Sequence, residues 1–300
     1  MVTEMLPKVT IGLCVKNNEP TIQFTVSSIL KVNYPCNLLE LIVVDGMSKD
    51  KTMEIITRIL KGSEISYEIF SDEGRGLAYA RQIVVDNSTG EFIQWVDGDH
   101  IIPRDFILKQ AKFMLSDEKL GAAEAITKHI GKSWVSKLEG YTWLYYGLRR
   151  AGIKDLESVG SAGTIYRVKA IKSVGGYDVK IRGAGEDGDL SRRMRKAGWR
   201  LAMNPTAYYF HVTRQNLKGL LKEYYWYGYG AYYVAKKHPG EVTPIRFIPP
   251  LPLFSGLRHS PLIYLLTKDY TSFLLPIHYS LKRLAWIYGY FKAYVDKYGW

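Results

Sequence analysis

Residues 95–100 read W-V-D-G-D-H and follow a short apolar-rich run, E-F-I-Q, at positions 91–94. Such a run is typical of a buried strand, which would place Asp97 and Asp99 where the strand ends. Their carboxylate oxygens are hard ligands that suit Mg²⁺ or Mn²⁺, and these ions complete their shell with water and substrate phosphates. Gly98 would let a ligand approach the backbone closely. Taken alone, D-G-D could also be a polar turn that only ends a strand.

The chain around this stretch alternates strand-like and helix-like segments. Strands are expected at 9–15, 39–44, 65–70 and 92–96, and helices at about 20–30, 48–60 and 77–85. This alternation predicts βα units and a mostly parallel, Rossmann-like α/β sheet flanked by helices. Each strand ends in a polar loop, and ligands of open α/β sheets bind at the carboxyl ends of the strands. The loops should therefore gather at one edge of the sheet.

Composition limits the class of protein and its partners. The chain has 300 residues and a formal charge of +12. These values suit one large domain, or a domain plus an extension, with anionic partners such as nucleotide phosphates, acidic lipids or nucleic acid. Cys14 and Cys36 have neither metal-ligand spacing nor a disulfide pattern. Because residues 1–8 also lack the basic start and apolar core of a signal peptide, we expect a cytoplasmic protein.

The middle of the chain carries a second acidic cluster. The stretch 185–193, G-E-D-G-D-L-S-R-R, places Glu186, Asp187 and Asp189 at a predicted helix start, where the helix dipole favours anions. These carboxylates could simply cap the helix or face solvent. Alternatively, one of them could accept the proton of a substrate hydroxyl. Other elements expected in this region are a strand at 121–125, a helix at 134–150 and a glycine-rich strand entry at 160–167.

The last third of the chain becomes aromatic and basic. One or two strands at 199–210, broken at Asn204-Pro205, should end at His211, and a helix with tyrosines beside lysines should span 216–237. A proline-rich linker is expected at 249–252. The apolar segments beyond it are interrupted by charges at 268–269 and 282–283, so none reaches the roughly 20 apolar residues that span a bilayer. We therefore expect helices that lie on a membrane surface or pack on the rest of the protein.

Read in order, these segments resemble the family-2 glycosyltransferases of the GT-A type. N-E at 18–19, V-V-D-G-M-S-K-D at 43–50, G-L-A-Y-A-R-Q at 76–82 and D-G-D at 97–99 resemble the family's N-E, V-V-D-D-G-S-T-D, G-x-x-x-A-R-N and D-x-D elements. V-G-G-Y-D at 174–178 and the stretch 185–193 resemble its V-G-G-F/Y-D and G-E-D-x-D-L-x-x-R elements. Gly46, Met47 and Gln82 depart from these patterns.

This resemblance implies a GT-A α/β fold and a metal-dependent, inverting glycosyltransferase that requires Mn²⁺ or Mg²⁺. Such an enzyme moves a sugar from a nucleotide-diphosphate sugar to an acceptor hydroxyl or a lipid-linked acceptor in glycan, polysaccharide or glycolipid synthesis. A polyprenyl-phosphate glycosyltransferase, of the dolichol-phosphate-sugar synthase type, is the alternative within the family. A nucleotidyltransferase would also use a metal and a nucleotide, but it would need no acceptor base. A non-enzymatic nucleic-acid or membrane binder would leave the ordered acidic motifs unexplained. We expect no nucleic-acid partner.

The resemblance also implies roles for the residues that match the family's motifs. The nucleotide-sugar would be bound by Asn18, Glu19, Asp45, Arg75, Arg81, Asp97 and Gly98. Within this set, Asp45 and Glu19 would accept hydrogen bonds from the base and ribose, while the two arginines would lie near the base or diphosphate. Glu19 could instead be an ordinary helix-start residue, and Arg81 a solvated helix charge.

The metal and the acceptor would be handled by other side chains. Asp99, Asp97 and His211 would ligate the metal, although a histidine in this position could also be structural. Asp187 would be the catalytic base, and Glu186 would orient the acceptor. The catalytic domain would span residues 1–240, with a nucleotide-sugar half at about 8–115 and an acceptor half at about 116–240. Residues 241–300 would form a helical extension peripheral to the cytoplasmic face of a membrane, where a glycan or polyprenol-linked acceptor would be met.

Overall fold

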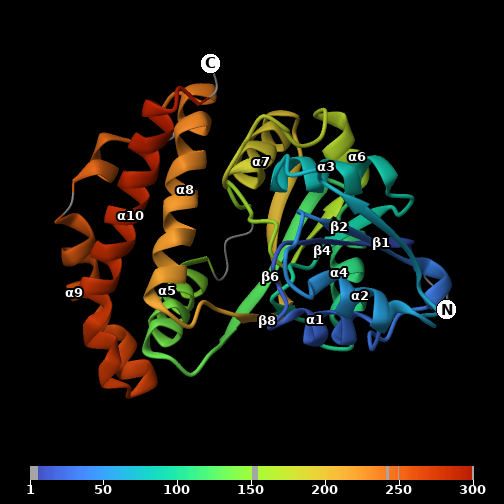
Figure 1. The fold of residues 1–300 in the computed structure, drawn as a ribbon, viewed down its shortest axis with the longest axis horizontal. Helices are drawn as coiled ribbons and strands as arrows, with labels where there is room; N and C mark the ends of the chain where they lie inside the picture. The colour runs from blue at the N-terminus through green and yellow to red at the C-terminus, as the bar shows by residue number, and fades with distance from the viewer. Residues whose placement is uncertain (1–5, 151–154, 241–242, 249, 299–300) are drawn as a thin grey trace. The chain divides into compact units, whose positions relative to one another are not determined.

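A computed structural model describes residues 6–150, 155–240, 243–248 and 250–298 (Figure 1). The chain divides into two compact units. The sheet unit comprises Met1–Lys128, Arg150–Val179 and Glu186–His211, and the helical unit comprises His129–Arg149, Lys180–Gly185 and Val212–Trp300. The predicted boundary between a catalytic domain and an extension, at 240/241, falls beside residues outside the described part and stays a prediction.

Within the described residues the sheet has eight strands in the order β3-β2-β1-β4-β7-β6-β8-β5. The first four in that order are parallel: β3 (Ser66–Ser71), β2 (Leu39–Asp45), β1 (Val9–Val15) and β4 (Phe92–Trp95). β7 (Thr164–Arg167) is antiparallel to both β4 and β6 (Leu120–Ile130). β5 (His100–Ile101) is antiparallel to β8 (Arg200–Val212). The predicted α/β fold is confirmed, with parallel strands in its first half and a mixed sheet as a whole.

Helices cover both faces of this sheet (Figure 1). On β2, Leu41 and Val43 pack with α1 (Ile22–Ile29), α2 (Thr52–Leu60) and α4 (Phe106–Leu115). The alternate residues Ile42 and Val44 pack on the other face with α3 (Leu77–Asn87), α6 (Val168–Ser173) and α7 (Glu186–Lys196). A strand buried on both sides reads as a continuous apolar run, which is why residues 41–44 show no polar alternation. Each such side chain contributes about 1.5–3 kcal/mol by burial.

The predicted break at Asn204-Pro205 is wrong, because β8 continues through both residues. Proline remains in a strand where its missing N–H faces outward, and Pro205 is exposed. The buried Asn204 amide donates to the Lys109 carbonyl (3.2 Å) and accepts from the Thr206 N–H (3.0 Å). These bonds hold the strand in place where the proline weakens the ladder.

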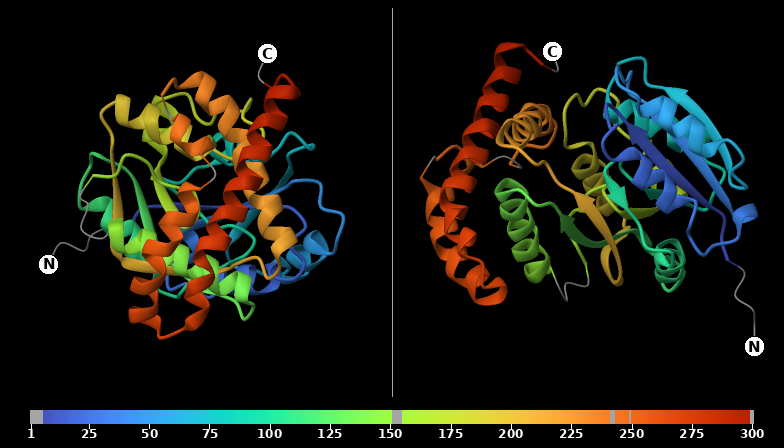
Figure 2. Two further views of the ribbon diagram at one scale, coloured as in Figure 1. Left: turned by 90° about the vertical axis from the view of Figure 1, so that its left-hand side faces the viewer. Right: turned by 60° about the horizontal axis from the view of Figure 1, so that its bottom comes forward.

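The helical unit contains α5 (Trp134–Arg150, its last residue in the sheet unit), α8 (Leu217–Lys237), α9 (Leu251–Thr267) and α10 (Leu275–Val295). α9 and α10 form a hairpin joined by the 3₁₀ turn η3 (Tyr270–Leu274) (Figure 2). Glycines let α8 and α10 approach closely, since a β-carbon at Gly228 would collide with the Trp286 carbonyl. Within the part of the chain that the structure describes, no helix combines the length and apolarity needed to cross a bilayer.

Two predictions for the last third need correction. The linker expected at 249–252 is not observed as such: Pro249 lies outside the described residues, while Pro250 and Pro252 open α9, a position that proline suits. Lys282 interrupts the apolar run of the sequence but not the helix, because α10 is continuous there. Lys282 is buried and contacts the Glu139 carboxylate, so its charge is compensated inside the unit.

Candidate functional site

The D-G-D loop follows β4 at the carboxyl edge of the parallel strands, as predicted. The Gly98 carbonyl accepts hydrogen bonds from Thr21 Oγ1 (2.7 Å) and Thr25 Oγ1 (3.1 Å) at the start of α1. A β-carbon at Gly98 would lie 2.6 Å from Asn18 Cγ, so no other residue fits without displacing that side chain. The loop after β1 and the D-G-D loop are therefore packed together, which brings Asn18 and Gly98 into contact.

Three side chains at this edge place potential metal-ligand atoms within 4.8 Å of one another: Asp99, His100 and His211. Strand pairing explains the cluster, because His100 on β5 lies directly opposite His211 on β8. His211 Nε2 is 3.5 Å from Asp99 Oδ2. Asp99 and His211, both predicted metal ligands, are thus adjacent, and a carboxylate oxygen beside an imidazole nitrogen is a donor pair that Mn²⁺ accepts.

His100 was not among the predicted site residues. Its Nδ1 accepts the Asp97 backbone N–H at 3.1 Å, so the proton of the neutral ring belongs on Nε2. Burial lowers the pKa of His100 to about 4, which keeps the ring neutral at physiological pH. Nε2 lies 3.7 Å from both Asp97 Oδ2 and Asp99 Oδ1. Both separations exceed hydrogen-bond distance, and among the described residues His100 Nε2 has no hydrogen-bond partner. A proton on Nε2 would disfavour metal ligation by that atom, so the predicted ligand set of Asp99, Asp97 and His211 stays a prediction.

Arg81 ties this loop to the second acidic cluster. Its side chain is 4 % exposed, so the interpretation of a solvated helix charge is wrong. The guanidinium contacts the Glu186 carboxylate and lies 3.6 Å from Asp97 Oδ1. Although burial opposes its charge, Glu186 and Asp97 raise the pKa of Arg81. Arg81 therefore stays cationic and links the D-G-D loop to the start of α7.

The neighbouring carboxylates of α7 have three different environments. Glu186 is buried against Arg81, and this burial raises its pKa. Asp187 is half-buried, with Oδ2 accepting from the Ser161 N–H at 3.3 Å and Oδ1 from the Gly188 N–H at 2.7 Å. Asp189 is fully buried and pairs with Arg193 at 2.7 Å, so the alternative that it faces solvent is wrong. Of the three, Asp187 has the partial exposure that contact with a substrate requires.

Glu124 on β6 is a further carboxylate that sequence reasoning missed. It pairs with Arg150 at 2.8 Å. Burial raises the pKa of Glu124 to about 7, Arg150 opposes this, and the Asp187 charge adds to it. The electrostatic influence of Asp187 indicates that both carboxylates belong to one region. A glutamate within the apolar strand A-A-E-A-I was the available signal, since a charge among apolar residues usually needs a partner.

The remaining predicted nucleotide-binding residues lie at the carboxyl ends of β1, β2 and β3: Asp45 is the last residue of β2, and the others follow β1 and β3. Asp45 accepts from the Ser48 N–H (3.2 Å), and Glu19 Oε2 accepts from the Lys51 N–H (3.2 Å). Arg75 is exposed and stacks on Tyr79, with 3.4 Å from Cζ to the ring centroid. The loop amides that bond Asp45 and Glu19 fit a structural role for these carboxylates as well as a binding one.

Met47 departs from the family pattern at a position where the backbone conformation favours glycine. Its φ is +61°, a left-handed conformation that favours glycine, which is the residue of the family pattern at this position. Met47 is also 55 % exposed. The loop thus keeps the conformation of the pattern while presenting a thioether side chain.

Comparisons with known proteins identify relatives in sequence and in fold. The chain is 26 % identical over 225 residues to the poly-beta-1,6-N-acetyl-D-glucosamine synthase of Staphylococcus aureus, covering 73 % of this chain and 53 % of the relative. It is 28 % identical over 244 residues to the pre-mycofactocin glycosyltransferase of Mycobacterium tuberculosis, covering 79 % and 49 %. The chain thus spans about half the length of these curated relatives.

The fold is similar to that of the mannosyltransferase PcManGT from Pyrobaculum calidifontis, solved in complex with GDP-Man and Mn²⁺. The TM-score is 0.70 at 18 % identity, covering 98 % of this chain and 89 % of the other. The model of "Glycosyl transferase family 2" matches residues 10–175, which include β1, the D-G-D loop and the V-G-G-Y segment. The chain therefore belongs to glycosyl transferase family 2.

Proposed function

We propose that this protein is a metal-dependent, inverting glycosyltransferase, and that it moves a sugar from a nucleotide-diphosphate sugar to a glycan or polyprenol-linked acceptor. The observation that carries the proposal is the meeting of Asp99 and His211 at the carboxyl edge, 3.5 Å apart, with Asp97 held beside them by Arg81. Mn²⁺ or Mg²⁺ bound there would offset the charge that develops on the departing diphosphate. The carboxylate oxygens suit either of these two ions.

Asp187 is proposed as the base. The acceptor oxygen would form a bond to the anomeric carbon while the bond to the diphosphate oxygen breaks, and the acceptor proton would pass to Asp187. One displacement of this kind inverts the anomeric configuration. Glu186, buried against Arg81, is proposed to position the start of α7. The loops that carry Asn18, Glu19, Asp45 and Arg75 are proposed to hold the nucleotide.

The experiment is a product analysis with the full chain, Mn²⁺ and a panel of nucleotide sugars. GDP-mannose is tested first, because the solved PcManGT complex contains it. Release of nucleoside diphosphate together with a glycosylated acceptor of inverted configuration supports the proposal. Release of pyrophosphate would indicate nucleotidyl transfer instead. Asp99→Asn serves as the inactive control, and hydrolysis without an acceptor sets the background.

A second candidate is transfer to a lipid phosphate, and the hairpin of α9 and α10 favours it. Leu257, Leu265 and Leu284 are 56 %, 63 % and 52 % exposed, and exposed apolar surface of this kind marks contact with a membrane or partner. We therefore also propose a peripheral position on the cytoplasmic face of a membrane. A phosphate acceptor is already ionised and needs no base, so Asp187→Asn would keep its activity on polyprenyl phosphate and lose it on a hydroxyl acceptor.

A further inference from the structure

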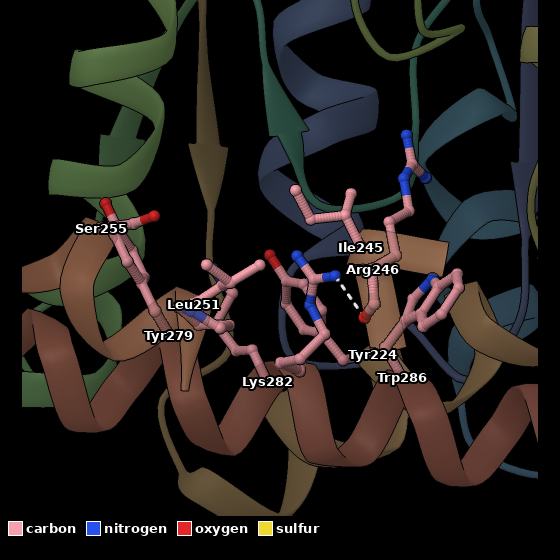
Figure 3. Close-up of a pocket in the computed structure, with 10 residues that line it drawn as sticks. Tyr224, Ile245, Arg246, Leu251, Ser255, Tyr279, Lys282 and Trp286 are labelled. Atoms are coloured by element: carbon pink, nitrogen blue, oxygen red, sulfur yellow. Dashed lines mark hydrogen bonds between the residues drawn. The ribbon is translucent and has the colours of Figure 1, made fainter. Parts of the chain in front are cut away.

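A cavity of about 560 Å³ lies within the helical unit (Figure 3). None of the residues proposed above for the nucleotide-sugar, the metal or the base is among its lining residues. Its lining comes from α8, α9, α10 and the 3₁₀ turn η2 (Pro244–Phe247). This volume is in the range that accommodates small organic ligands. Aromatic side chains form much of the wall: Tyr224, Tyr279 and Trp286.

The charge of the lining is basic. Arg246, Lys282 and Arg283 contribute to it, and among the described residues the lining contains no acidic side chain. Lys282 is compensated by Glu139, which also accepts a 2.7 Å hydrogen bond from His278 Nε2. The net charge of the cavity therefore comes from the two arginines.

These two arginines lie close together. Arg283 Nη1 donates to the Arg246 carbonyl at 2.6 Å, the dashed line in Figure 3. Burial lowers the pKa of Arg283, and the neighbouring Arg246 charge lowers it further. A guanidinium carries five N–H donors in a planar fork, so this one bond leaves most of its capacity unused. An anion bound at Arg283 would satisfy those donors and offset the neighbouring charge of Arg246.

An apolar surface begins on α9, one of the helices that line the cavity. Leu251 lines the cavity, and the residues that follow on α9 include Phe254 and Leu257, which are 61 % and 56 % exposed. On α10, exposed apolar residues recur at Ile277, Leu284, Tyr288 and Phe291. Their spacing of seven, four and three residues places them on one face of the helix. A basic cavity beside such a surface is complementary to an anionic head joined to a hydrocarbon chain.

We propose that this cavity binds the phosphate head of a phosphorylated lipid, whose chain lies along the exposed apolar residues of α9 and α10. The phosphate would accept hydrogen bonds from Arg283, with Arg246 at the open side, and the aromatic wall would contact the first carbons of the chain. The site lies wholly within the helical unit. It uses the exposed surface of α9 and α10 on which the second candidate function also rests, but its test measures lipid binding alone and is therefore separate from any assay of sugar transfer.

The test uses the full chain and soluble probes, measured by titration calorimetry. The probes are dihexanoyl phosphatidic acid below its micellar concentration, glycerol phosphate, and dihexanoyl phosphatidylcholine. The phosphatidic acid should bind. The zwitterionic phosphatidylcholine should bind at least about tenfold more weakly, because it has no net charge. Glycerol phosphate should also bind at least about tenfold more weakly, because it lacks the hydrocarbon chains. Equal binding of glycerol phosphate would identify a free-phosphate site and overturn the lipid assignment.

Arg283→Gln should weaken phosphatidic acid binding about tenfold, the loss expected for one charge-assisted contact. Arg246→Gln should weaken it several-fold, and because Arg246 is exposed this variant tests the site even if Arg283→Gln fails to fold. Arg258→Gln is the matched control: it removes the same charge from an exposed position on α9 outside the cavity and should change affinity less than twofold. An equal loss in all three variants would mean non-specific attraction and overturn the proposal.

Discussion

Removal of the charge of Glu186 should chiefly lower the stability of the protein, whereas removal of the charge of the adjacent Asp187 should chiefly lower the rate of transfer. Glu186 contacts the buried Arg81, whose second partner, Asp97, is 3.6 Å away. Glu186→Gln would leave that guanidinium with Asp97 as its remaining charged partner. Removal of one partner of a buried ion pair costs about 3–5 kcal/mol, and the lower end applies because glutamine keeps an acceptor oxygen. We therefore expect a loss of about 3 kcal/mol in the free energy of unfolding.

Asp187 differs because its two hydrogen bonds come from backbone N–H groups. Asp187→Asn keeps one oxygen to accept from them, so the loss should be near the value of a single hydrogen bond, about 1 kcal/mol. If Asp187 is the base, transfer to a hydroxyl acceptor should fall by about 10²–10⁴. Donor affinity should stay close to that of the unsubstituted protein, because the hydrogen bonds of Asp187 come from Ser161 and Gly188 and not from a proposed nucleotide-binding residue.

The assay combines three measurements on both variants: the thermal midpoint, Mn²⁺-dependent donor affinity, and the single-turnover transfer rate. A loss of about 3 kcal/mol lowers the midpoint by roughly 5 °C in a protein of this size. Asp187→Asn should therefore be stable and inactive, and Glu186→Gln destabilised with a smaller loss of rate once folded. A Glu186→Gln variant that is fully stable yet inactive would refute the reasoning and move the base to Glu186.

Further predictions concern the metal site and the helical unit. Asp99→Asn should abolish Mn²⁺-dependent donor binding without changing the thermal midpoint, whereas His211→Ala should weaken Mn²⁺ affinity by a smaller factor; unchanged Mn²⁺ titrations would exclude the respective ligand. His100→Phe should also weaken Mn²⁺ binding by about 10–100-fold, as loss of a group that orients ligands does, and His100→Gln should restore part of it. Burial alone would raise the pKa of Glu139, but the His278 hydrogen bond and the Lys282 charge lower it to about 2. A lowered folded-state pKa gives stability that is present above the unfolded value near 4.5 and lost as pH falls toward 2, so Glu139→Gln should flatten the fall of the thermal midpoint between pH 5 and pH 2.

The sequence predicted the parallel half of the fold well because each element there is specified locally. The strand predicted at 9–15 is β1, and Asp97, Gly98 and Asp99 lie beyond the carboxyl end of β4. His100 could not be assigned in the same way. The position of His100 depends on the pairing of β5 with β8, in which its partner His211 is distant in the sequence. A strand of two residues is also too short to show the periodicity from which its register could be predicted.

For Arg81, the sequence contained a signal for burial but could not identify the partner of the buried charge. Ala78, Arg81 and Val85 are buried on α3, and their spacing of three and four residues already places Arg81 on the apolar face of that helix. An arginine in such a register usually has a buried partner, because a charge is costly to bury alone. Only the fold identifies Glu186 as that residue. The family resemblance assigned Arg81 to the nucleotide, whereas its ion pairs make it a link between the proposed metal loop and the proposed base helix. Its removal should therefore affect donor binding and acceptor chemistry together, and an Arg81→Met variant that loses donor affinity alone would argue for direct contact with the nucleotide.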